Sequence, residues 1–233
     1  MNVVITGASK GLGLACAEVF AAAGASLVLC ARGEQDMERA AEGLRAAYPE
    51  APVRAGAFDL SRTEEAKAFG NWVLRDDRPV DVLINNAGRF VMGSVFEEPE
   101  GSLESMIETN LYSAYHVTRA LLPAMMARRR GHIFNVCSIA SLQAYKYGGS
   151  YSVSKFALLG FSKNLREDMK PHGIKVTAVC PGAVYTASWE GSGVDPERIM
   201  TASDVARMVY AAATLSPQAT VEDIILRPQL GDL

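Results

Sequence analysis

The sequence lacks the features that would mark a membrane, disulfide-rich or nucleic-acid-binding protein. No apolar run among its 233 residues reaches the roughly 18 residues that a membrane span needs. Its four cysteines, Cys16, Cys30, Cys137 and Cys180, are far apart and show no metal-ligand spacing, so we expect buried free thiols and no metal site. Neither sign of charge dominates, since the formal net charge is −3, which argues against nucleic acid or an acidic membrane as a partner.

Apolar runs that fit strands alternate with helical patterns along the chain. The expected strands are residues 2–6, 26–31, 53–57, 81–84, 132–137, 174–180 and 222–226, and most are apolar on both faces. The expected helices are residues 11–24, 36–48, 62–75, 103–129, 151–170 and 203–214, with Ser61 and Glu64 spaced as a capping box before the third. This alternation predicts an α/β fold: a single doubly wound, Rossmann-like domain over residues 1–233, with a mostly parallel seven-stranded sheet flanked by helices. Because the first strand follows Met1 almost at once, we expect no leader and a cytoplasmic protein.

A glycine-rich segment directly follows the first strand. Its residues are Thr6, Gly7, Ala8, Ser9, Lys10, Gly11, Leu12 and Gly13. Glycines there allow a tight turn, a close backbone approach to a pyrophosphate, and packing of the following helix. The spacing G-x3-G-x-G differs from the G-x-G-x-x-G fingerprint, so a glycine turn without a ligand stays as an alternative.

The residue after the second strand points to the type of dinucleotide. Folds that bind NAD usually carry an acid at this place, whereas this chain has Arg32. Together with Lys10, Arg32 would suit the 2′-phosphate of NADP(H) through charge-assisted hydrogen bonds. We therefore expect NADP(H), with the alternative that both cations are solvated surface residues and that the cofactor is NAD(H).

Three further residues have the spacing of a proton-transfer site. Tyr151 and Lys155 are four residues apart, hence on one face of an expected helix, and Ser138 stands at the end of a strand, where open sheets bind ligands. A tyrosine hydroxyl with a pKa near 10 is a poor base, and a nearby ammonium stabilises the tyrosinate and so lowers its pKa. Each residue alone is ordinary, but together with the glycine-rich segment they predict hydride and proton exchange with a carbonyl.

Together with four further motifs, the glycine-rich segment and the Ser138, Tyr151 and Lys155 group resemble the short-chain dehydrogenase/reductase family, in the family's order and from residue 3 to about 226. The further motifs are Asp59-Leu60, Asn85-Asn86-Ala87-Gly88, Asn110 and Pro181-Gly182-x-Val184-x-Thr186. The resemblance implies that Tyr151 is the general acid/base, that Lys155 lowers its pKa and binds ribose, and that Ser138 orients the carbonyl. It implies that Asn110 holds a water of a proton relay and that Asp59 and Leu60 contact adenine. Taken alone, Asp59 would be interpreted as an acidic residue of a turn or helix start. The remaining cofactor positions it implies are Asn85, Ala87 and Gly88 after the fourth strand, and Pro181, Gly182, Val184 and Thr186, of which the last two meet the carboxamide.

We therefore expect an NADP(H)-dependent oxidoreductase with a small-molecule carbonyl or alcohol as its substrate. The alternatives are an NAD(H)-dependent alcohol dehydrogenase of the same family and a non-catalytic nucleotide-sensing protein. The residues expected around the substrate include no lysine or arginine, which favours a neutral ketone or aldehyde; they are Phe90, Met92, Leu142, Gln143, Tyr145, Tyr147, Tyr185 and Trp189.

Two segments depart from the family or lie outside its motifs. The irregular stretch 185–202 is short for the region that covers the substrate, and the tail from Arg227 to Leu233 is either a dimer contact or a disordered end. Because the family is commonly oligomeric through its long helices, we expect a homodimer or homotetramer.

Overall fold

The centre of the molecule is a parallel sheet. The computed structural model describes residues 1–76, 78–186, 189 and 193–232, and within them seven strands pair in the order β3-β2-β1-β4-β5-β6-β9. Every pairing in this sheet is parallel. The strands are β1 (Asn2–Thr6), β2 (Ser26–Ala31), β3 (Val53–Ala57), β4 (Val82–Asn85), β5 (Gly131–Val136), β6 (Ile174–Pro181) and β9 (Asp223–Leu226). The expected fold class is confirmed.

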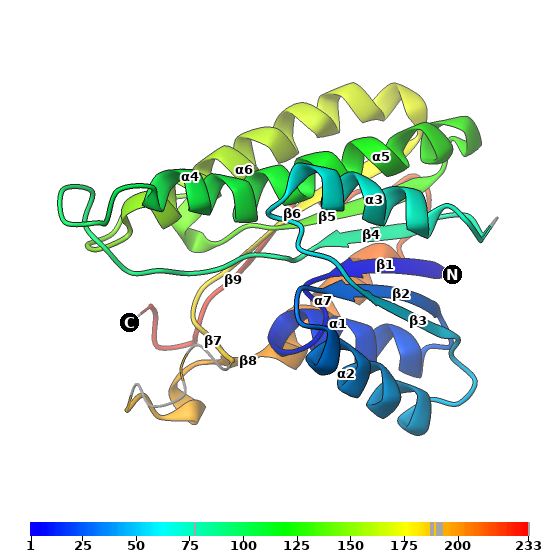
Figure 1. Ribbon diagram of the computed structural model, residues 1–233, viewed down its shortest axis with the longest axis horizontal. Coiled ribbons are helices and arrows are strands. Elements are labelled where there is room, and N and C mark those ends of the chain that lie inside the picture. The colour runs from blue at the N-terminus through cyan, green and yellow to red at the C-terminus, as the bar shows by residue number, and fades with distance from the viewer. Residues whose placement is uncertain (77, 187–188, 190–192, 233) are drawn as a thin grey trace.

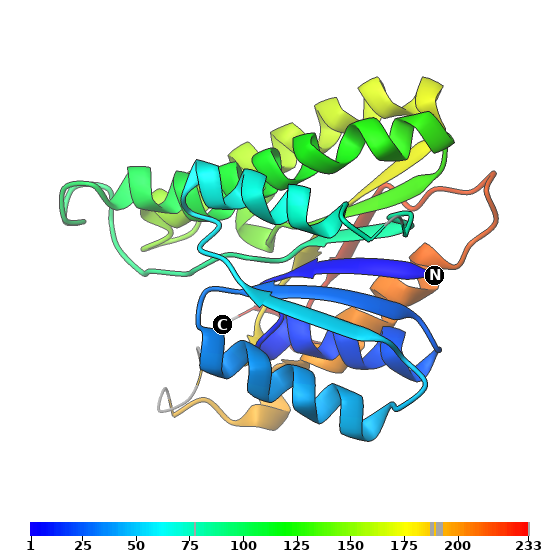
Figure 2. The same ribbon diagram turned by 45° about the vertical axis from the view of Figure 1, so that its right-hand side comes forward.

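Helices cover both faces of this sheet (Figures 1 and 2). One face carries α1 (Gly11–Ala22), α2 (Glu34–Ala47) and α7 (Ala202–Ala213), and the other carries α3 (Thr63–Val73), α5 (Ser113–Arg128) and α6 (Gly149–Met169). The apolar cores follow this division, with Phe20 and Phe134 in the first and Phe69 in the second. All three rings are fully buried, and each contributes about 1.5–3 kcal/mol. Among the described residues, no helix is both long and apolar enough to cross a bilayer.

The strand order creates a crevice at one edge of the sheet. From β1 the chain moves outward through β2 and β3, and then returns to β4 on the other side of β1. In open parallel sheets, ligands bind at the carboxyl ends of strands where the order reverses in this way. The segments that follow β1, β4, β5 and β6 all leave the sheet at this edge (Figure 1).

One expectation about the helices is confirmed with a local difference, and another is wrong. The expected helix 103–129 runs without a gap from α4 (Ser102–Ile107) through a π-helical turn (Glu108–Tyr112) into α5. The expected capping box of Ser61 and Glu64 does not form, because α3 begins after Arg62 and Ser61 donates its hydroxyl to Asp59 Oδ1 instead (2.7 Å). A carboxylate two residues away competes well for a serine hydroxyl, since the contact needs only a local turn.

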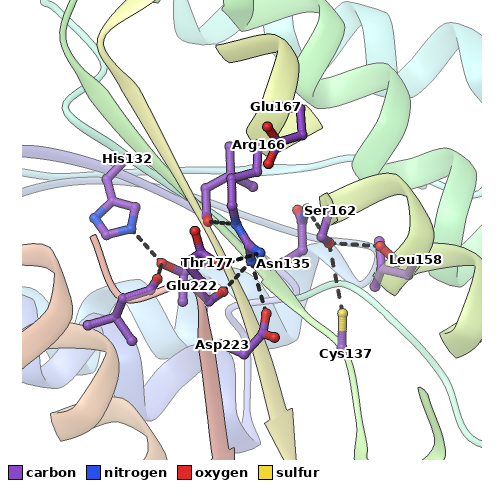
Figure 3. A network of polar contacts seen from close by, with 12 residues as sticks. His132, Asn135, Cys137, Leu158, Ser162, Arg166, Glu167, Thr177, Glu222 and Asp223 are labelled. Atoms are coloured by element: carbon purple, nitrogen blue, oxygen red, sulfur yellow. Dashed lines mark hydrogen bonds and ion pairs between the residues drawn. The ribbon is translucent and has the colours of Figure 1, made fainter. Parts of the chain in front are cut away.

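A buried polar network fixes α6 to the sheet (Figure 3). Arg166 is 6% exposed, and it donates to the carbonyl oxygen of Val176 on β6 (2.9 Å) and to the carboxylate of Asp223 on β9 (2.9 Å). Ser162, one turn earlier, accepts a hydrogen bond from Asn135 Nδ2 on β5 (2.9 Å). The helix is therefore tied to three strands by directional bonds.

The chain after β6 folds back over the crevice edge. There β7 (Val184–Tyr185) and β8 (Met200–Thr201) form a small second sheet. Of the segment 185–202, residues 187, 188 and 190–192 lie outside the described residues, as does residue 233 of the tail. Up to residue 232 the tail contacts its own chain, since Arg198 donates to the carbonyl oxygens of Gly231 (3.0 Å) and Leu230 (3.3 Å).

Candidate active site

The glycine loop, residues 6–13, turns sharply at the end of β1. Gly7 has a φ of +65°, in the left-handed region where a side chain is strained. Gly13, in the first turn of α1, lies so close to this turn that a β-carbon would collide with the carbonyl oxygen of Gly7. Because these positions exclude side chains, the backbone at the start of α1 stays open to a ligand.

Asn86, which belongs to the motif after the fourth strand, holds this loop in place. Its Nδ2 donates to the carbonyl oxygens of Thr6 (3.0 Å) and Gly7 (2.9 Å). In return, Thr6 Oγ1 accepts hydrogen bonds from the backbone N–H groups of Asn86 and Ala87 (both 3.0 Å). The glycine loop and the segment after β4 therefore form one rigid unit.

The amino end of α1 fits an anion. Its N-cap residue, Lys10, makes no side-chain cap bond, and the first turn contains no acidic residue. Free N–H groups and the positive end of the helix dipole favour a phosphate at such a place. Lys10 and Arg32 are both exposed, and within the part of the chain that the structure describes neither forms an ion pair. The loop thus fits a pyrophosphate, and the two cations fit a further phosphate.

Asp59 and Leu60 follow β3 in a tight local turn. The Asp59 carboxylate accepts from the N–H (3.2 Å) and the hydroxyl (2.7 Å) of Ser61, and the Asp59 N–H donates to Glu65 (2.7 Å). Leu60 is buried. The side chain of Asp59 therefore shapes the turn, as the alternative interpretation from sequence had it, and its backbone carbonyl also takes part by accepting from the Arg62 N–H (3.0 Å).

Tyr151, Ser138 and Lys155 converge at the carboxyl end of β5. Ser138 begins a short 3-10 helix; its hydroxyl accepts a hydrogen bond from the Ala140 N–H (3.1 Å) and lies near enough to Tyr151 to lower its pKa. Lys155 lies one turn after Tyr151 on α6, with its ammonium 5.8 Å from the centre of the tyrosine ring. The same ammonium donates to the carbonyl oxygen of Val136 (2.8 Å). The spacing seen in the sequence brings these three groups to one place.

Burial governs the protonation of this group. It raises the pKa of Tyr151 above the ordinary value of 10, and the neighbouring Ser138 hydroxyl opposes this in part. Burial also lowers the pKa of Lys155. The pKa of Tyr151 in the chain alone is therefore raised, and its lowering by Lys155 stays a prediction for the site with cofactor bound.

Asn110 lies in the π-helical turn and is fully buried. Its Oδ1 accepts from the N–H of Arg89 (2.8 Å), and its Nδ2 donates to the carbonyl oxygen of Arg89 (3.1 Å) and to Ser154 Oγ (2.9 Å). π-helical turns are rare in proteins overall, but those that occur often lie at functional sites. Asn110 therefore joins the segment after β4 to the helix that carries Tyr151.

The residues after β4 divide between the interior and the crevice. Asn85 faces the interior, where its Nδ2 donates to Thr118 Oγ1 (2.9 Å) and Asn135 Oδ1 (2.8 Å), so its side chain is not available to a cofactor. Gly88 faces the crevice, because a β-carbon there would lie 3.1 Å from Asn110 Oδ1 and 3.6 Å from Lys155 Nζ.

The segment after β6 closes the crevice from the other side. A β-carbon on Gly11 would lie 3.3 Å from Thr186 Cγ2, so Thr186 touches the glycine loop. Val184 is buried on β7, and Pro181 ends β6. Gly182 packs against the tail, where a β-carbon would lie 2.7 Å from Asp232 Oδ1.

Two of the expected substrate residues, Phe90 and Tyr145, lie beside Tyr151. Phe90 packs edge-on against Tyr151, with ring centroids 4.8 Å apart. Met92 and Tyr147 line a pocket of about 360 Å³. Burial, with the charge of nearby Tyr151, raises the pKa of Tyr145 to about 12. Of the others, Leu142 and Gln143 are exposed, and Tyr185 and Trp189 are half-buried.

Comparison with known proteins agrees with this arrangement. A family model described as short chain dehydrogenase matches residues 1–196. The chain is 38% identical to dehydrogenase/reductase SDR family member 7B from Xenopus tropicalis over 79% of this chain and 61% of that protein, so it spans about three fifths of that relative's length. It is 32% identical to sepiapterin reductase from Chlorobaculum tepidum over 99% of this chain and 97% of that one. A solved structure of a metagenomic short-chain oxidoreductase in complex with NADP matches with a TM-score of 0.86 and 31% identity, covering 98% of this chain and 97% of that one.

Proposed function

The chain belongs to the short-chain dehydrogenase family, and from its site we propose that it is an NADP(H)-dependent oxidoreductase that interconverts a neutral ketone or aldehyde and the matching alcohol. One observation carries the proposal. The hydroxyls of Tyr151 and Ser138 and the ammonium of Lys155 meet at the crevice that the glycine loop borders. A nucleotide-binding protein without catalysis has no need of a half-buried tyrosine beside a serine hydroxyl and a lysine ammonium.

The cofactor is NADP(H), held by residues of this chain. The glycine loop binds the pyrophosphate at the start of α1, and Lys10 and Arg32 bind the 2′-phosphate. In this proposal Thr186, which lies against Gly11, contacts the nicotinamide end. When bound, the cofactor supplies or accepts the hydride. The NADP complex of the similar metagenomic enzyme supports this choice.

Tyr151 moves the proton in this proposal. Because burial raises its pKa, the hydroxyl is protonated at neutral pH and acts as the general acid toward a developing alkoxide. Ser138 donates a hydrogen bond to the same substrate oxygen and holds it near the tyrosine. Lys155, fixed by its bond to Val136, stabilises the tyrosinate that remains. The resting chain is thus set for reduction of a carbonyl.

The substrate is a neutral carbonyl compound with apolar groups next to the reacting carbon. Phe90 borders Tyr151 directly, and Met92 and Tyr147 line the neighbouring pocket. An anionic oxo acid would meet no cation among these residues. A far higher activity with oxo acids than with neutral ketones would contradict this choice.

The working form is a homodimer or homotetramer. Tyr112 at the start of α5 and Val153 and Phe156 on α6 are exposed apolar residues on neighbouring helices. Sedimentation of the full chain at micromolar concentration measures this, and a monomer would contradict it.

Two variants test the enzymatic proposal. Tyr151→Phe keeps the ring and removes the acid, so it should bind NADPH with an unchanged Kd while carbonyl reduction falls by about 10²–10⁴-fold. Arg32→Asp should weaken NADPH binding and improve NADH binding. Near-normal turnover in Tyr151→Phe would refute the mechanism, and a preference of the unmodified chain for NADH would refute the cofactor.

A further inference from the structure

Helix α6, which carries Tyr151 in its first turn, has no cap of its own. The residue before it is Gly148, no side chain near it in sequence caps it, and its first turn has no acidic residue. The first N–H groups of a helix have no partner within the helix and need one from elsewhere. Here the partner comes from the loop between β4 and α4, residues 86–101.

Glu98 of this loop caps α6 from 52 residues away. Its Oε1 accepts from the Ser150 N–H at 2.9 Å and its Oε2 at 3.2 Å. The Ser150 hydroxyl also donates to Oε2. Ser150 directly precedes Tyr151 and is 6% exposed, so this contact is made next to the reacting group and largely away from solvent.

Two glycines leave the space that this carboxylate occupies. A β-carbon on Gly93 would lie 2.5 Å from Glu98 Cγ, and one on Gly149 would collide with Glu98 Oε1. The Gly93 N–H donates to the carbonyl oxygen of Tyr147 (3.1 Å), which adds a second bond between the loop and the segment before α6. The carboxylate is therefore confined to one position.

The same loop touches Tyr151 a second time, because Phe90 packs edge-on against its ring. Glu98 also borders the pocket that Met92 and Tyr147 line. One loop thus sets both the backbone before Tyr151 and the wall beside the expected substrate.

We propose that Glu98 is a positioning residue for the proposed reaction: its carboxylate locks the 86–101 loop to the first turn of α6 and so aims the Tyr151 hydroxyl at Ser138. The inference rests on the proposed function for its kinetic part. Its structural part, a single lock that holds both segments, is independent of any activity. Glu98 acts through Ser150 and Tyr151 and need not touch the substrate.

The test compares Glu98→Gln with Glu100→Gln in the full chain. Both remove one carboxylate from the same loop, but Glu100 is exposed and lies outside the pocket and the contact with α6. Glu98→Gln should keep the Kd for NADPH and lower kcat for ketone reduction by about 10- to 100-fold, since displacing a reacting group by about 1 Å can cost that much. Ser150→Ala keeps the N–H bond to Glu98 and loses the hydroxyl bond, so its kcat should lie between those of Glu98→Gln and the unmodified chain. Glu100→Gln should match the unmodified chain.

Hydrogen exchange gives the readout that does not need activity. Glu98→Gln should speed exchange of the amides of residues 89–101 and 150–152 together, and leave those of β5 unchanged. If the unmodified chain reduces no carbonyl but the exchange result holds, the proposed function fails while the lock stands. The positioning role is overturned if Glu98→Gln has normal kcat and normal exchange, if Glu100→Gln is equally impaired, or if Glu98→Gln lowers only the melting temperature.

Discussion

His132 makes the stability of this fold depend on pH in a way that one variant can isolate. It lies on β5 and is 4% exposed, stacked on Phe134 with ring centroids 4.0 Å apart. Its Nε2 is 2.7 Å from Thr177 Oγ1, and that hydroxyl donates its single proton to the carbonyl oxygen of Val221 (2.5 Å; Figure 3). Nε2 must therefore carry the ring proton. Nδ1 is left as a buried nitrogen with no hydrogen-bond partner.

Protonating Nδ1 would bury both a charge and an unsatisfied N–H group. Burial, with a smaller contribution from the charge of Lys175, accordingly lowers the pKa of His132 from 6.5 to about 3. The unfolded chain binds this proton below about pH 6.5 and the folded chain does not. Stability is thus full above pH 6.5 and falls as the pH falls toward 3, by about 1.4 kcal/mol for each pH unit. Between pH 8 and pH 5 the expected loss is about 2 kcal/mol.

The assay is urea unfolding of the unmodified chain and of His132→Gln at pH 8, 7, 6 and 5. Glutamine can keep the donor to Thr177 but does not titrate, so its free energy of unfolding should fall by about 2 kcal/mol less over this range. Only the difference between the two slopes is used, because the carboxylates contribute equally to both proteins. An equal m-value confirms that the same surface is exposed on unfolding. Parallel pH profiles for the two proteins would refute the reasoning.

Two other substitutions test the glycine loop and the α6 network. Gly13→Val should abolish NADPH binding measured by fluorescence, because the side chain collides with the Gly7 carbonyl, whereas Gly43→Val, at an open position of α2, should not. Arg166→Met should lower the free energy of unfolding in urea by about 2–4 kcal/mol, since it leaves Asp223 and a buried carbonyl without their donor. The exposed Lys163→Met on the same helix should change it by less than about 0.5 kcal/mol, and a similar effect of both would contradict the role given to the network.

The fold could be predicted because its signals are local. Most strands of the main sheet are short apolar runs, and a run that is apolar on both faces is typical of a sheet covered on both sides. The π-helical turn between α4 and α5 could not be predicted in this way. It goes with the bonds from Asn110 to Arg89, 21 residues earlier, and nothing in the sequence near residue 110 shows that partner.

The same difference between local and distant signals applies to the residues of the site. Tyr151 and Lys155 share a helix face, so their spacing alone places them together, and a serine at the end of β5 must reach the same edge. Glu98 was not predicted because its partner, Ser150, is 52 residues away. Asn86 belongs to a predicted motif, but its bond to Thr6, 80 residues away, could not be predicted from the sequence. The raised pKa of Tyr151 was not predicted for another reason. The sequence indicates which charged residues are near, but not how much solvent is removed from the hydroxyl by burial.

The way α6 meets the sheet explains how a short chain can hold Tyr151 so accurately. Lys155, Ser162 and Arg166 are spaced i, i+7 and i+11, which places them on one helix face. Each bonds to the sheet, at the Val136 carbonyl, the Asn135 amide and the Val176 carbonyl. Apolar contacts tolerate small slips along a helix, whereas hydrogen bonds weaken steeply once their angles are lost. A rotation of α6 large enough to turn the Tyr151 hydroxyl away from Ser138 would strain all three bonds at once. The polar face of the helix therefore fixes the reacting group from the sheet side, and Glu98 fixes it from the substrate side.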